Sequence, residues 1–75
     1  MKPEKLLKEF GHHLRTIRKI RKLSQEQLGL LAELDRTYIS GIERGVRNIS
    51  LLNIFKLAQA LEIPPSDLFI FGEKQ

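Results

Sequence analysis

The chain repeats one local pattern three times, and this pattern divides it into short helices. Each copy has a Ser or Asp that can cap a helix N-terminus, flanked by two apolar residues placed to form a hydrophobic staple. The caps are Ser24, Asp35 and Ser50, and their staples are Leu23 with Leu28, Leu34 with Ile39, and Ile49 with Ile54. In the first copy, Gln27 completes a capping box. The pattern predicts helix starts at about Gln25, Arg36 and Leu51.

Two further helices are expected at the ends of the chain. Residues 3–22 begin with Pro3, which suits a first helical position, and carry an apolar stripe at three- and four-residue steps. That stripe comprises Leu6, Leu7, Phe10, Leu14 and Ile17. A last helix should begin at Pro64 and Pro65 and turn Leu68 and Phe69 inward. No segment alternates as a strand would. The expectation is one all-α domain of five helices over residues 1–75.

The second and third helices are separated by very few residues. They span about 25–32 and 36–44, so only Glu33, Leu34 and Asp35 lie between them. Two short helices joined by so tight a turn must cross steeply, as in a helix-turn-helix. Residues 23–45 are therefore predicted to form this motif, and residues 50–71 to supply core and dimer contacts.

The third predicted helix has one apolar face and one polar face. On a wheel at 100° per residue, Tyr38, Ile39 and Ile42 cluster on one side. The other side carries donors and small residues without an acid: Arg36, Thr37, Ser40, Gly41 and Arg44. Such a surface can enter a DNA major groove without repulsion, and the small Ser40 and Gly41 would keep it thin.

Base contacts are expected at the N-terminal end of this helix. Arg36 can pair with guanine O6 and N7, unless it is simply solvated. Thr37 can contact a base or a phosphate, and Ser40 lies one turn later. For Tyr38 two interpretations stand: a packed ring whose hydroxyl reaches DNA, or a purely structural side chain.

Phosphate contacts should come from helix starts and from the segment after the third helix. The candidates are Gln25, Arg44, Arg47 and Asn48. The net charge of +4 fits a polyanion partner, and residues 1–22 hold eight Lys or Arg against two acids. Charge alone is equally compatible with a solvated helix face.

Several segments together resemble the XRE family of phage-repressor and Cro-like regulators. These segments are residues 24–28 (SQEQL), 38–45 (YISGIERG), 48–51 (NISL) and 57–61 (LAQAL). The resemblance covers about residues 10–70. It implies a compact five-helix domain that binds operator DNA, usually as a symmetric dimer. It also implies a partly buried structural ion pair between Arg18 and Glu43.

The sequence departs from the family at Glu33, where a glycine is usual in the turn. If the backbone there needs a positive φ, Glu33 costs about 1 kcal/mol. Within the family, the length and residues 35–40 look like controller proteins of restriction–modification systems, which autoregulate their operon. A phage-type repressor, or an antitoxin that binds a toxin and its own promoter, would use the same scaffold.

A dimer is expected because one such domain covers too little DNA for tight specific binding. An apolar patch of Leu52, Phe55, Ile70 and Phe71 is the candidate interface. On the fourth helix, Leu51, Ile54, Ala58 and Leu61 should face the core instead. In the alternative interpretation, Phe55 and Phe71 only close that core. A two-fold dimer would recognise a pseudo-palindromic operator.

Other classes of function have little support in the sequence. There is no cysteine and no paired carboxylate site, and His12 and His13 point about 100° apart, so no catalytic residue, metal site or cofactor is expected. No small-molecule ligand, membrane span or signal peptide is expected, and a cytoplasmic location fits. RNA polymerase is a further candidate partner. A protein-interaction module without DNA binding is the rival class, against which the acid-free face argues.

Overall fold

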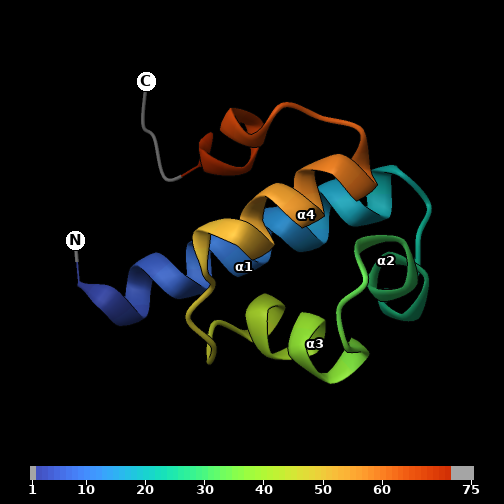
Figure 1. The fold of residues 1–75 in the computed structure, drawn as a ribbon. Helices are drawn as coiled ribbons and strands as arrows, with labels where there is room; N and C mark the ends of the chain where they lie inside the picture. The colour runs from blue at the N-terminus through green and yellow to red at the C-terminus, as the bar shows by residue number, and fades with distance from the viewer. Residues whose placement is uncertain (1, 72–75) are drawn as a thin grey trace.

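The computed structural model describes residues 2–71, which form four α-helices and a short 3₁₀ helix (Figure 1). The elements are α1 (Pro3–Ile20), α2 (Gln25–Ala32), α3 (Arg36–Arg44), α4 (Leu51–Leu61) and η1 (Pro65–Phe69). No strand occurs among the described residues, so the chain folds as an all-α domain. The last element differs from the predicted fifth α-helix.

The three capped starts lie where the sequence predicts them. The Ser24 side chain accepts from the Gln27 backbone at 3.0 Å, and the Gln27 side chain accepts from the Ser24 backbone at 2.8 Å, which completes the capping box. Ser50 caps α4 in the same way at 3.1 Å. Asp35 accepts from the Thr37 backbone at 3.4 Å. Local hydrogen bonding therefore sets where α2, α3 and α4 begin.

Three helix ends depend on side-chain-bearing residues in the left-handed region. Lys22, Glu33 and Glu62 have φ values of 60°, 59° and 59°. Helix α1 ends at Ile20, two residues before the predicted boundary, because the chain turns left-handed at Lys22. Glu33 thus does adopt the positive φ that the family's usual glycine would favour.

Residues 65–69 form a 3₁₀ helix and not an α-helix. Positions 64 and 65 are both proline, which has no backbone N–H, and the segment is too short for an α-helix to propagate. Its buried residue is Leu68, as expected. Phe69 was expected inside, yet 52% of it is exposed, and its ring centre lies 5.9 Å from that of Phe10. The tighter 3₁₀ turn rotates Phe69 away from the core that Leu68 enters.

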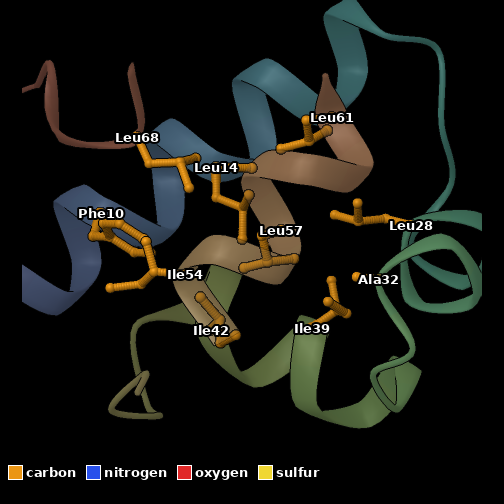
Figure 2. Close-up of a cluster of buried hydrophobic side chains, with 11 residues drawn as sticks. Phe10, Leu14, Leu28, Ala32, Ile39, Ile42, Ile54, Leu57, Leu61 and Leu68 are labelled. Atoms are coloured by element: carbon orange, nitrogen blue, oxygen red, sulfur yellow. The ribbon is translucent and has the colours of Figure 1, made fainter. Parts of the chain in front are cut away.

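All five elements contribute side chains to one core (Figure 2). Its buried members are Phe10, Leu14, Leu28, Ala32, Ile39, Ile42, Ile54, Leu57, Ala58, Leu61 and Leu68. On α4 the buried stripe starts at Ile54 and includes Leu57, whereas Leu51 was expected inside and is 70% exposed. Leu51 opens the helix one turn before the part that packs. Leu6 likewise lies on the exposed first turn of α1, not in the buried stripe.

Helix α1 lies unusually close to α3 at Gly11. A Cβ atom at this position would overlap the backbone oxygen of Ile42 and lie 2.8 Å from that of Glu43. Gly11 is itself buried, so a side chain there has no space to enter. The glycine therefore allows the backbones of α1 and α3 to approach within direct contact, and it fixes the position of α3 in the domain.

Replacing Glu33 with glycine should stabilise the domain. Glu33→Gly removes the left-handed strain of about 1–2 kcal/mol, partly offset by the greater freedom of glycine in the unfolded chain. We expect the free energy of unfolding to rise by about 1 kcal/mol, measured by urea denaturation. Glu33→Ala keeps a Cβ atom and is the matched control. An equal gain from both variants would mean that the glutamate charge, not its backbone, is the cost.

Candidate nucleic-acid interface

A buried ion pair joins the first helix to the third. The Arg18 Nε and Nη2 atoms donate to the two carboxylate oxygens of Glu43 at 2.7 and 3.0 Å. The side chains are only 8% and 3% exposed. Arg18 also donates from Nη1 to the backbone oxygen of Leu23 at 2.7 Å. The structure thus contains the pair that the family resemblance implies, and Arg18 is turned away from solvent.

Gln25 extends this network to the start of α2. Its Nε2 atom donates to Glu43 Oε1 at 3.1 Å, so the Glu43 carboxylate accepts from two helices at once. The side chain of Gln25, expected to contact a phosphate, is therefore held in place by an internal hydrogen bond. The side chain is half-buried, so part of it remains accessible at the surface.

Three of the four predicted base-contacting residues lie together on the surface, and Tyr38 does not line the same depression. Gln25, Arg36, Thr37 and Ser40 line one shallow depression at the N-terminal ends of α2 and α3. Arg36 and Thr37 are exposed, and Ser40 is half-buried. The structure therefore places three predicted base contacts and one predicted phosphate contact side by side, at the end of α3 that a groove would meet.

A second groove continues from the first along α1. It shares Gln25 and Ser40 and adds the cations Arg15 and Arg44 at its sides, with the Arg18–Glu43 pair beneath. Arg15 could not be identified as a site residue from the sequence, because the basic residues of α1 follow no regular spacing. Its distance of three residues from Arg18 was the one available signal.

The segment after α3 bends back over that helix. Arg47 is exposed, and its guanidinium carbon lies 5.1 Å from the ring centre of Tyr38. Gly41, expected on the open face, is instead buried beneath the Arg47 side chain. The Tyr38 ring is half-buried, and its hydroxyl accepts from Asn53 Nδ2 at 3.0 Å. Asn48 is exposed and lies farther away, at an apolar groove beside Leu6.

Three of the four predicted dimer residues are exposed, on α4 and just after η1. Leu52, Phe55 and Ile70 are 66%, 53% and 65% exposed. Phe71 differs, because its ring packs inside the domain at 6.0 Å from Phe10 and 5.7 Å from His13. The exposed apolar area also includes Leu51 and Phe69, which the sequence analysis had assigned to the core.

Residues 14–68 match the family model described as Helix-turn-helix, which is most of the chain. The chain belongs to the XRE-type helix-turn-helix family of DNA-binding transcription regulators, which is not an enzyme class. Within residues 2–71, no helix has both the length and the apolar character needed to cross a membrane.

Within this family, the chain is similar to control proteins of restriction–modification systems. It is 51% identical over 63 residues to control protein C.BamHI of Bacillus amyloliquefaciens, covering 83% of this chain and 78% of the relative. The structure of controller protein C.AhdI from Aeromonas hydrophila superposes with a TM-score of 0.83 at 56% identity, covering 84% and 96%. The C.Esp1396I tetramer in complex with its 35 base-pair operator gives 0.78 at 36%, covering 85% and 84%.

Removing one partner of the buried ion pair should destabilise the fold. Glu43→Gln leaves the Arg18 guanidinium buried without a countercharge, and we expect a loss of about 3–5 kcal/mol in the free energy of unfolding. Chemical denaturation measures it. The double variant Arg18→Met with Glu43→Leu should recover most of that loss.

The control for this experiment is the exposed pair of Arg21 and Glu62, at 3.8 Å with side chains 40% and 81% exposed. Arg21→Ala should cost less than about 1 kcal/mol, because solvent screens such a pair. Similar losses at the two pairs would contradict the structural role of the buried one.

Proposed function

We propose that this protein is a sequence-specific DNA-binding regulator that controls transcription of a restriction–modification operon. Its α3 enters the major groove and its dimer reads a pseudo-palindromic operator. In this proposal it lies in the cytoplasm with its DNA and carries no catalytic site or cofactor. The similarity to C.BamHI and C.AhdI supports the restriction–modification context.

One observation carries the proposal: the exposed side of α3 has no acidic side chain. Glu43 is the single acid of this helix, and it is buried against Arg18. The outward residues of the first turns, Arg36 and Thr37, can both donate hydrogen bonds. A surface of this kind meets the dense negative charge of DNA without repulsion, and its donors can read guanine or adenine edges.

The proposed role of each side chain follows from its exposure and from its position along α3 or beside it. Arg36, Thr37, Tyr38 and Ser40 contact bases at the N-terminal half of α3, where groove-reading helices make such contacts. Gln25, Arg44, Arg47 and Asn48 hold the DNA backbone on either side and set the register. The operator complex of C.Esp1396I, a structural neighbour over most of its length, supports a DNA role for this scaffold.

Dimerisation supplies the second half of the reading surface. The exposed apolar side chains of Leu52, Phe55 and Ile70 are the proposed two-fold contact, and Phe71, which packs on Phe10, completes the proposed interface. Two copies of α3 would then meet major grooves about 34 Å apart. Activation of a promoter would in addition require a contact with RNA polymerase.

DNA binding should be specific and strongly salt-dependent. The probe is a duplex from immediately upstream of the protein's own coding sequence, compared with a scrambled duplex of equal composition by fluorescence anisotropy. Two phosphate-binding arginines per protomer predict a slope of about −4 in log affinity against log salt for a dimer. Affinity that ignores salt, or equal affinity for both duplexes, would refute the proposal.

Single substitutions distinguish a base-contacting residue from a phosphate-contacting one. Arg36→Ala should cost about 1–3 kcal/mol and relax preference at one base pair of each half-site. Arg47→Ala should weaken both duplexes evenly and flatten the salt slope by about one unit per protomer. Lys56, which lines a groove with Leu31 and Gln59 instead, provides the control Lys56→Ala, with no expected change.

The dimer surface can be tested without DNA. Leu52→Glu places a charge in the proposed interface, and we expect it to shift the protein from dimer to monomer in sedimentation equilibrium. Leu30→Glu is the matched control, since Leu30 is 75% exposed on α2. Both variants keep an exposed residue exposed, so folding is preserved. A dimer that persists in Leu52→Glu would place the interface elsewhere.

A further inference from the structure

The side chain of Arg47 runs across the surface of α3 at the position of Gly41. A Cβ atom at Gly41 would lie 2.5 Å from Cγ, 3.5 Å from Cδ and 3.6 Å from Cβ of Arg47. The aliphatic part of Arg47 thus occupies the space beside Gly41, and a larger residue at position 41 would displace it. Since Gly41 is buried by this contact, it does not belong to the open reading surface.

The charged end of Arg47 lies over an aromatic ring that is itself fixed. Its guanidinium carbon is 5.1 Å from the Tyr38 ring centre, within the range of a cation–π contact. The ring packs against the hydrophobic core, and the Tyr38 hydroxyl accepts a 3.0 Å hydrogen bond from Asn53 of α4. Arg47 therefore contacts Gly41 and Tyr38 of α3, and Asn53 of α4 holds the Tyr38 ring on which the guanidinium lies.

We propose that Gly41, Tyr38 and Asn53 form a seat that sets Arg47 in place for its DNA contact. Asn53 is in this view a positioning residue, which acts on DNA affinity through Tyr38 and Arg47, whereas Tyr38 positions Arg47 in addition to its own DNA contact. This inference rests on the proposed function, and it assigns a role to Asn53, which lies outside the helix-turn-helix.

The physical reason lies in the entropy of the free side chain. A solvent-exposed arginine samples many rotamers, and gripping one phosphate restricts most of them. An arginine that already lies along α3 loses less freedom on binding, so more of the contact energy appears as affinity. The seat also brings a cation from the loop after α3 to the flank of the reading surface.

The hydrogen-bond direction adds a second consequence for Tyr38. The hydroxyl accepts from Asn53, and a hydroxyl that accepts one hydrogen bond can still donate another. Its hydrogen can therefore be donated to an acceptor on DNA. Tyr38 can therefore be both a packed residue and a DNA contact, which joins the two interpretations that the sequence alone left open.

A double-mutant cycle between Gly41 and Arg47 tests the seat. The probe is again the duplex from upstream of the protein's own coding sequence. Gly41→Ala displaces Arg47 and should weaken binding about two- to fivefold, the size of an exposed cation–π contact. In the Arg47→Ala background the same substitution should have no effect, because nothing remains to displace.

The salt dependence distinguishes positioning from loss of a contact. Gly41→Ala retains the Arg47 charge, so the slope of log affinity against log salt should equal that of the unmodified protein. Arg47→Ala removes the charge and should make this slope less steep. Asn53→Ala and Tyr38→Phe both break the hydroxyl bond. We expect Asn53→Ala to weaken binding about twofold, and Tyr38→Phe, which also removes the hydroxyl that can contact DNA, to weaken it by at least as much; the double variant should be no worse than Tyr38→Phe alone.

The outcomes separate this inference from the proposed function. If the unmodified protein fails to bind the duplex, the proposed function is wrong. If it binds, but Gly41→Ala lowers the affinity equally in the unmodified protein and in Arg47→Ala, the alanine obstructs DNA directly and the proposed positioning of Arg47 is wrong. If Tyr38→Phe weakens binding and Asn53→Ala does not, Asn53 has no positioning role. Thermal unfolding of each variant ensures that folded protein is compared.

Discussion

The carboxylate of Glu43 is the point on which the arrangement of the first three helices depends. It accepts two hydrogen bonds from Arg18 on α1 and one from Gln25 on α2, while lying on α3 itself. A buried acid is costly unless it is fully paired, and this one is. The same contacts remove the only negative charge of α3 from its outer face, so fold and electrostatics have a common origin.

Local features of the sequence were sufficient to predict where three of the helices begin. Caps and staples act over four or five residues, and the structure has Ser24, Asp35 and Ser50 as N-caps. The tight turn at Glu33 followed from the spacing between two such starts. The ion pair of Arg18 and Glu43 could not be derived in this way, because 25 residues separate them; it came from the family resemblance.

What the sequence did not reveal depends on contacts between distant segments. The helical wheel correctly predicted Ile39 and Ile42 inside. It predicted Gly41 on the open face, because a wheel describes one helix and does not include the loop that returns over α3. The periodicity of α4 likewise extended to Leu51, although this side chain is 70% exposed and the apolar stripe buried on α4 begins only at Ile54. A periodic pattern shows which residues lie on the same face of a helix. It does not show over what length of the helix other elements pack against that face.

The contact at Gly11 has a consequence for how operators are chosen. Helix α3 is joined to α1 near its C-terminal end, both by backbone packing of Gly11 on Ile42 and Glu43 and by the buried ion pair between Arg18 and Glu43. Such a unit does not tilt to follow a groove of altered width. In a complex, any mismatch between the spacing of two half-sites and the protein would have to be absorbed by bending or twisting of the duplex. Steps between half-sites that no side chain touches would then be selected for their flexibility, so part of the recognised sequence would lie where the protein makes no contact.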